Sequence, residues 1–133
     1  YWAQQALEAN YKARYGVLLD MVGGRGCTFA REQVSRQYAD PVVELIWHLA
    51  HQIGYGHFFP LTDGGCLVDD HVNVNRIARM PCLDIVPYFV DGPSNFGPTW
   101  HTLQDTPENI DPRVLKAVGQ TITQLIYNDN AEE

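Results

Sequence analysis

Residues 15–24 read YGVLLDMVGG, and this stretch decides the fold class. Its apolar residues follow one another, with Asp20 as the single interruption, until two glycines end the run. That pattern is typical of a strand buried on both faces of a sheet. Residues 82–86, CLDIV, form a second run of the same kind, and a weaker third strand is expected near residues 58–59. Strands of this type need helices on both faces of their sheet.

Helices are predicted on either side of these strands. A short one opens the chain over residues 1–10, and a longer one begins at Asp40-Pro41 and stops at Gly54. In the longer helix Asp caps the N-terminus, Pro occupies the first turn and Gly ends the last turn. The Asp111-Pro112 pair repeats this device and starts a final helix, which leads into a polar, frayed tail over residues 128–133. Helices that alternate with buried strands predict a three-layer αβα sandwich.

Two or three strands make a thin sheet for helices to cover on both sides. Residues 88–110 add a long segment with several Gly and Pro residues and no apolar period. Long loops of this kind often carry functional residues. We therefore expect this chain to be one part of a larger α/β domain.

The composition is that of a globular segment with an acidic balance. The chain has 133 residues, of which 45% are hydrophobic and 19% charged. Its net charge of −7 and its lack of Lys or Arg clusters argue against a nucleic-acid partner, because phosphate binding needs such clusters. Its apolar runs are far shorter than the roughly 18 residues that a membrane helix requires, so no membrane span is expected.

The three cysteines, Cys27, Cys66 and Cys82, form an odd number without any CxxC spacing. They therefore predict neither a zinc knuckle nor a complete disulfide framework. Buried free thiols are the simplest interpretation. A bridge between one pair in an oxidising compartment stays open, and the sequence does not say which pair.

Acidic residues stand where α/β folds place their sites, beyond the carboxyl ends of strands and in the following loops. Asp20 ends the first buried run, where a carboxylate needs a hydrogen bond, an ion partner or a metal. A turn acid without chemical function is the alternative. Residues 69–71, Asp-Asp-His, put two carboxyls and an imidazole at a loop-to-helix junction. Each alone suits an N-cap, but clustered carboxyls also hold the perturbed pKa values that acid-base chemistry uses.

Histidines are the other candidates. His101 follows Trp100 in the long loop, so it could be a metal ligand beside an aromatic wall, although a lone loop histidine is more often simply exposed. His48 and His51 share one face of the helix that begins near Pro41, without an obvious acidic third ligand. We interpret both as solvated or rim histidines, and His57, in the turn over residues 56–58, as similarly unremarkable.

The order of several of these blocks resembles a known family. The blocks are residues 15–23 (YGVLLDMVG), 69–71 (DDH) and 100–102 (WHT), followed by Asp105, Glu108-Asn109 and Asp111. Together they are similar to the zinc-dependent glutaminyl cyclases of the animal type, which share a fold with the M28-type zinc aminopeptidases. The resemblance spans about residues 11 to 127 and implies a three-layer αβα sandwich around a central mixed sheet.

The resemblance also implies roles for five residues. A single zinc is held in this family by an Asp, a Glu and a His, and the WHT block makes His101 the zinc ligand. Asp20 and Asp69 correspond to acids that hydrogen-bond with a catalytic Glu. Trp100 corresponds to the tryptophan that lines the pocket for the glutamine side chain, and Phe96 is placed to extend the same wall.

The other two zinc ligands and the catalytic Glu belong to an N-terminal half of the family domain that has no counterpart before Tyr1. We therefore expect residues 1–133 to be the C-terminal portion of one zinc exopeptidase-like domain. Such a portion offers one metal ligand where three are needed, so alone it should neither hold zinc tightly nor catalyse.

For the intact protein the resemblance implies cyclisation of an N-terminal glutamine to pyroglutamate, with a peptide or protein N-terminus as substrate. The alternative is a two-zinc aminopeptidase, in which Asp20 is itself a zinc ligand. Trp before His101, and Asp rather than Ser at Asp69, favour the cyclase. A non-catalytic binding module is a third interpretation. Enzymes of this family act on secretory or envelope peptides, so a periplasmic or secreted location is expected.

Overall fold

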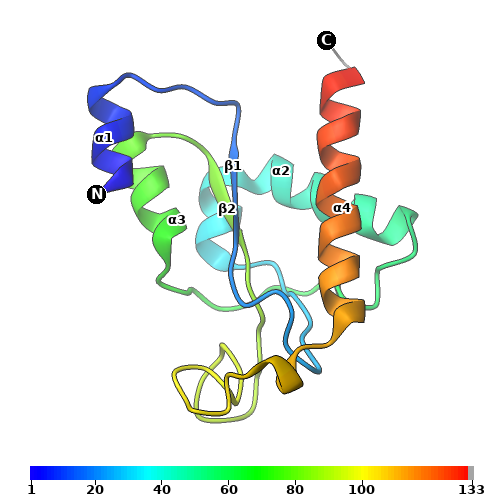
Figure 1. Ribbon diagram of the computed structural model, residues 1–133. Helices are drawn as coiled ribbons and strands as arrows, with labels where there is room; N and C mark the ends of the chain where they lie inside the picture. The colour runs from blue at the N-terminus through cyan, green and yellow to red at the C-terminus, as the bar shows by residue number, and fades with distance from the viewer. Residues whose placement is uncertain (132–133) are drawn as a thin grey trace.

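The computed structural model describes residues 1–131, and residues 132–133 of the predicted tail lie outside the described chain. In chain order the helices and strands are α1 (Trp2–Glu8), β1 (Gly16–Leu19), α2 (Gln33–Gln52), α3 (Asp70–Asn73), β2 (Cys82–Ile85) and α4 (Pro112–Ala131) (Figure 1). A π-helical turn over Val74–Ala78 follows α3, and a 3₁₀ turn over Pro107–Asn109 precedes α4. In this part of the chain no helix is both long and apolar enough to cross a membrane.

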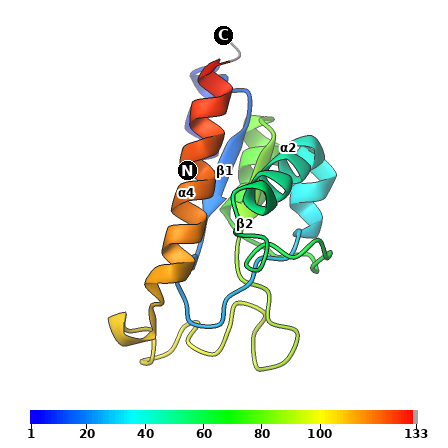
Figure 2. The same cartoon turned by 90° about the vertical axis from the view of Figure 1, so that its right-hand side faces the viewer.

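The strands lie between two helical layers. Figure 2 shows α4 on one side of β1 and β2 and α2 on the other. The predicted α/β layering is therefore confirmed, and the sheet within residues 1–131 consists of two parallel strands. Their register runs from Gly16 opposite Cys82 to Leu19 opposite Ile85, so both carboxyl ends lie at the same edge of the sheet.

The two strands differ in burial. β2 is buried along its whole length, as its apolar run predicts. β1 was expected to be buried on both faces, but its residues are only half-buried and Leu19 is 45% exposed. The helices cover the two strands unequally: α2 packs closely against β2, whereas no helix of the described chain packs as closely against β1.

Helix α2 begins earlier than its sequence predicts. Its N-cap is Glu32, not Asp40, and the Asp40 carboxylate instead accepts a hydrogen bond from Arg36 Nε at 2.8 Å. At the predicted start the helix is kinked: Ala39 has non-helical angles (φ −138°, ψ 31°), and Pro41 has no N–H to donate to the preceding turn. The helix ends before Gly54, whose φ of 91° makes it the predicted stop.

Helix α4 begins as predicted. The Asp111 carboxylate accepts a hydrogen bond from the backbone N–H of Arg113 at 2.9 Å, and Pro112 is the first helical residue. The helix continues through Ala131, so residues 128–131 are helical where a frayed tail was predicted.

The weaker strand predicted near residues 58–59 is not found in the described chain. Phe58 and Phe59 lie in turns, closed by hydrogen bonds from their N–H groups to the carbonyls of Tyr55 and Gly56 at 3.0 and 3.2 Å. The apolar pair serves the core instead, because Phe59 is wholly buried and packs edge-on against Trp47 with ring centroids 5.2 Å apart.

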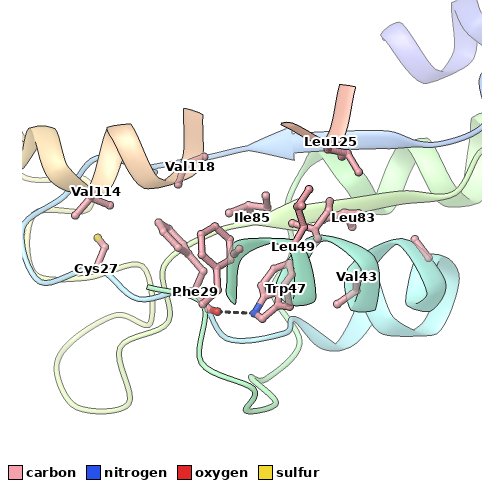
Figure 3. Close-up of a cluster of buried hydrophobic side chains, with 14 residues drawn as sticks. Cys27, Phe29, Val43, Trp47, Leu49, Leu83, Ile85, Val114, Val118 and Leu125 are labelled. Carbon is pink, nitrogen blue, oxygen red and sulfur yellow. Dashed lines mark hydrogen bonds between the residues drawn. The ribbon is translucent and has the colours of Figure 1, made fainter. Parts of the chain in front are cut away.

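The hydrophobic core fills the space between the helical layers and the sheet. Figure 3 shows Val114, Val118 and Leu125 of α4 facing the strands from one side, and Val43, Trp47 and Leu49 of α2 from the other. The one polar atom of the Trp47 side chain is satisfied, because Nε1 donates to the carbonyl of Phe29 at 3.0 Å (Figure 3).

All three cysteines are free. Cys27 and Cys82 are buried, as predicted for structural thiols, and burial raises the pKa of both. Cys66 is exposed, so the prediction of a buried thiol is wrong for this residue. Its place in the turn-rich segment before α3 explains the difference, because such segments run over the surface.

Candidate active site

Asp20 lies at the point where β1 ends. Its backbone N–H donates to the carbonyl of Ile85 at 3.1 Å, which extends the parallel ladder past the strand. The next residue, Met21, has a left-handed φ of 53°, so the chain turns sharply directly after Asp20. A left-handed conformation costs a non-glycine residue about 1–2 kcal/mol. The turn fixes the half-buried Asp20 carboxyl at the carboxyl-terminal edge of the sheet.

The Asp69 carboxyl meets the Asp20 carboxyl at this edge. Asp69 is the N-cap of α3, and its Oδ1 accepts a hydrogen bond from the N–H of Asp70 at 2.8 Å. Burial raises the pKa of Asp20 to about 6, and the Asp69 charge, a hydrogen bond with Asp69 and the Asp70 charge add to the effect. Two carboxyls can form a hydrogen bond only if one of them carries a proton. The pair is therefore suited to take up and release a proton near neutral pH.

A third carboxyl, that of Asp84, lies behind the first two. Asp84 is in the middle of β2, opposite Leu18 of β1, and is wholly buried. Burial raises its pKa to about 9, and the nearby Asp69, Asp20 and Glu32 carboxyls add to the effect. Asp84 is therefore protonated at neutral pH. We call Asp20, Asp69 and Asp84 the carboxyl cluster.

The carboxyl cluster needs protons, because the rest of the chain does not supply donors. Within residues 1–131, Asp69 Oδ2, both Asp84 carboxyl oxygens and His71 Nδ1 are buried without a hydrogen-bond partner. Two buried groups lie beyond Asp84: His71 Nδ1 is 3.6 Å from Asp84 Oδ2, and His71 Nε2 is 2.8 Å from Glu32 Oε2. The first distance is too long for a hydrogen bond, and the second is within hydrogen-bond range.

Sequence reasoning missed Asp84 and Glu32 and left His71 without a role. Asp84 had a visible signal, because it is the single acid inside an otherwise apolar, buried run. Glu32 had none, since it lies in a segment that was not assigned to a helix.

Trp100 and His101 lie in the long loop before α4. The rings of Phe96 and Trp100 are stacked with centroids 5.2 Å apart, and those of Trp100 and His101 with centroids 3.9 Å apart. His101 is exposed and has a left-handed φ of 54°. The loop therefore presents an aromatic stack with an imidazole at its surface.

A cavity of about 360 Å³ adjoins this loop. Phe96 and Met21 are among its lining residues, and Phe89 and Leu115 contribute further apolar surface. Trp100, His101 and the carboxyl cluster do not line it. Phe96 thus connects the cavity to the aromatic stack.

The structure brings together only part of the predicted site. Asp20 and Asp69, two of the three residues expected to converge, lie together at the end of β1. His101 makes no hydrogen bond or ion pair with either of them in the described chain. Figure 1 places the long loop at the same end of the molecule as the carboxyl ends of β1 and β2.

The described residues do not by themselves make a metal site. Within residues 1–131, no three His, Cys, Asp or Glu side chains are grouped so as to hold a metal ion. A protein zinc site uses three or four such ligands. His101 offers one exposed imidazole, so any zinc bound through it needs ligands from outside these residues.

The remaining histidines have structural surroundings. His48 is largely exposed, with Nδ1 2.7 Å from the carbonyl of Glu44. His51 Nε2 is 2.8 Å from the carbonyl of Phe59, and the His57 ring packs edge-on against Phe58. All three histidines are exposed, which agrees with their interpretation as solvated or rim residues.

The fold and its polar cluster define an α/β exopeptidase-like domain, and the chain belongs to peptidase family M28, whose family model matches residues 1–126. Three solved structures illustrate the relationship. The Tannerella forsythia glutaminyl cyclase is 54% identical, with a TM-score of 0.91, and the match covers 96% of this chain and 44% of that one.

The Porphyromonas gingivalis glutaminyl cyclase is 42% identical, with a TM-score of 0.93 and coverage of 97% of this chain and 47% of that one. A Zn-dependent exopeptidase from Parabacteroides distasonis is 45% identical, with a TM-score of 0.92 and coverage of 96% and 44%. The chain therefore spans less than half the length of these proteins, and its relatives include both cyclases and zinc exopeptidases.

Proposed function

We propose that the full-length protein is a glutaminyl-peptide cyclotransferase, which converts an N-terminal glutamine to pyroglutamate and releases ammonia. The observation that carries the proposal is the contact between Asp20 and Asp69 at the carboxyl end of β1, with the pKa of Asp20 raised to about 6. The identity of 54% to a glutaminyl cyclase supports it further.

The reaction needs a group that moves one proton. A bond forms between the α-amine nitrogen and the side-chain amide carbon of the glutamine, and the bond from that carbon to the amide nitrogen breaks. The attacking amine loses a proton and the leaving nitrogen gains one. A carboxyl group that carries it must have a pKa near the working pH.

In this proposal a catalytic Glu from outside this chain carries the proton, and Asp20 and Asp69 hydrogen-bond with it. Their like charges would raise the pKa of that Glu, as the Asp69 charge already adds to the effect of burial on the pKa of Asp20. Trp100 and Phe96 would form one wall of the glutamine pocket and exclude water. Such a wall holds the amine and the amide in attack geometry, on which intramolecular cyclisation depends.

Zinc is the proposed cofactor, with His101 as the ligand from this chain. A bound zinc would act as a Lewis acid toward the substrate carbonyl. Because His101 is the single ligand that residues 1–131 offer, we propose that this chain alone is inactive and that the rest of its domain is its obligatory partner. A periplasmic or secreted location is part of the proposal, and cell fractionation tests it.

An assay of the full-length protein on two matched peptides, one beginning with Gln and one with Leu, tests this function. We expect pyroglutamate and one ammonia per turnover from the first peptide, and no free leucine from the second. Free leucine without pyroglutamate would instead support a two-zinc aminopeptidase, the alternative favoured by the 45% identity to a Zn-dependent exopeptidase. Turnover of neither peptide would contradict both enzymes and favour a binding module.

A further inference from the structure

Glu32 is a buried carboxylate with an unusual number of hydrogen bonds. It is 2% exposed, and its two side-chain oxygens accept five hydrogen bonds between them. Oε1 accepts from the N–H groups of Val34 (2.8 Å) and Leu67 (3.1 Å). Oε2 accepts from the N–H (2.7 Å) and hydroxyl (2.8 Å) of Ser35 and is 2.8 Å from His71 Nε2.

These contacts exceed the needs of a helix cap. Capping α2 requires only the N–H groups of Val34 and Ser35, which lie in its first turn. The bonds to Leu67 and His71 reach a different segment, the one that carries Asp69. Leu67 lies two residues before Asp69 and His71 two residues after it. Glu32 therefore holds both sides of the turn that presents the Asp69 carboxyl.

Glu32 also reaches Asp84 by two routes. Through its side chain, Asp84 lies 3.6 Å from the Nδ1 of His71, whose Nε2 bonds Glu32. Through its backbone, the N–H of Asp84 donates to Ser35 Oγ at 2.9 Å, and that hydroxyl donates to Glu32. The backbone route is a continuous chain of hydrogen bonds, and the side-chain route places the His71 ring beside the Asp84 carboxyl.

The charge of Glu32 fits this arrangement. Burial raises its pKa, but hydrogen bonds from His71 and from the N–H groups of Val34, Leu67 and Ser35 outweigh that effect and lower the pKa to about 2. Glu32 is therefore an anion at neutral pH. A buried anion persists only where donors or a cation compensate it, and removing one partner from such a network is costly.

We propose that Glu32, acting through His71 and Ser35, is a positioning residue for the carboxyl cluster. It connects α2, β2 and the segment around α3 beside Asp69 and Asp84. The inference rests on the proposed function, because the carboxyl cluster is assigned to cyclisation there. Glu32 itself does not touch the substrate in this account.

Glu32→Gln in the full-length enzyme tests the inference. The variant keeps the shape, but one oxygen becomes an NH₂ group that cannot accept the bonds converging on it. We expect kcat on a Gln-initiated peptide to fall by about tenfold or more, as for outer residues that orient a site, with KM changed less than twofold. The pH–rate profile of the variant should also move. Ser35→Ala, which removes one bridge and leaves Glu32 intact, should lower kcat less.

Trp47→Phe is the matched control. Trp47 is also buried on α2 and loses one hydrogen bond, to Phe29, without touching the carboxyl cluster. This variant should lose stability and keep its kcat and its pH profile. If Glu32→Gln behaves like Trp47→Phe, Glu32 is a structural cap and the inference is wrong. If Glu32→Gln does not fold, Ser35→Ala decides, and an unchanged kcat in that variant overturns the inference.

A readout without turnover separates this inference from the proposed function. The ¹³C carboxyl resonance of Asp84, followed against pH in selectively labelled enzyme, should change in Glu32→Gln and not in Trp47→Phe. If the wild type shows no cyclisation but Asp84 responds in this way, the proposed function fails and the positioning role stands. If Asp84 does not respond, the positioning role fails whatever the activity.

Discussion

Asp84 carries a wholly buried carboxyl whose pKa is raised to about 9 from a usual value of 3.8, first by burial and then by Asp69, Asp20 and Glu32. His71 and Cys82 are further ionisable groups close to it. Between those pH values the folded state keeps the proton and the unfolded chain loses it. Unfolding therefore releases a proton, and stability must fall as pH rises through this window, by at most about 1.4 kcal/mol per pH unit for one proton.

Asp84→Asn should remove this pH dependence, because the amide resembles a protonated carboxyl and cannot ionise. We expect the difference in free energy of unfolding, full-length variant minus wild type, to become more positive as the pH rises from 5 to 8. Urea unfolding of both proteins at four pH values measures the difference. Asp63→Asn is the control: Asp63 is exposed, and the Arg36 hydrogen bond lowers its pKa, so its difference should be flat over the same range. A flat difference for Asp84→Asn would contradict the buried, protonated acid.

Single residues were predictable where chemistry leaves a mark in the sequence. Asp20 was a candidate because a carboxylate at the end of a buried strand needs a partner, and Asp69 because it belongs to an acidic cluster at a helix start. The structure places the two side chains together. Glu32 was not predictable, since its partners Leu67 and His71 are more than 30 residues away and only the fold brings them to it. The roles of Trp100 and His101 stay predictions, carried by the resemblance.

The two Asp-Pro pairs have the same local sequence, but their acids contribute differently to the stability of the fold. Both predict a helix start, yet only Asp111 caps its helix, with its carboxylate on the N–H of Arg113. Asp40 lies inside α2, and its carboxylate is 45% exposed in an ion pair with Arg36. Pro41 produces a kink at Ala39 inside α2 and does not start the helix. The residue that caps the helix, Glu32, is not followed by a proline, so nothing in the sequence indicated this start.

Replacing each of these acids by alanine tests the difference. Asp111→Ala should lower the free energy of unfolding by about 1 kcal/mol, the usual effect of losing a side-chain cap. Asp40→Ala should lower it by less than about 0.5 kcal/mol, because exposed ion pairs contribute little. Denaturant midpoints of the two variants against wild type measure both. Equal losses would mean that Asp40 also caps a helix in solution.

Elements were predicted well where burial was uniform. β2 is buried on both faces, so its sequence and its structure agree. β1 has the same kind of apolar sequence but is partly exposed. An apolar run predicts a strand that can be buried, but it does not show which helices of the described chain cover that strand. The strand predicted at residues 58–59 is absent from the described chain for another reason. Two adjacent aromatic residues are typical of a strand, but here they lie in a turn and Phe59 packs into the core.

At the scale of the whole molecule, the chain corresponds to less than half of the proteins it matches. A partial domain explains two features of the described chain. β1 is only half-buried, and the candidate site has a cluster of acids but too few grouped side chains to hold a metal ion. Under the proposed function, this part of the domain handles the proton and most of the metal ligands come from the rest. In that proposal Asp20 shares a proton, whereas in the aminopeptidase alternative Asp20 would be a zinc ligand.

Asp20→Asn in the full-length protein, with zinc per chain and the rate of pyroglutamate formation measured on the same preparations, tests this assignment most directly. The amide keeps the shape of the side chain but cannot share a proton with Asp69. We predict one zinc per chain in both wild type and variant, and a rate reduced by about 10²-fold in the variant, within the range for acid-base groups. Two zincs in the wild type that fall towards one in the variant, or a variant with the wild-type rate, would contradict the account.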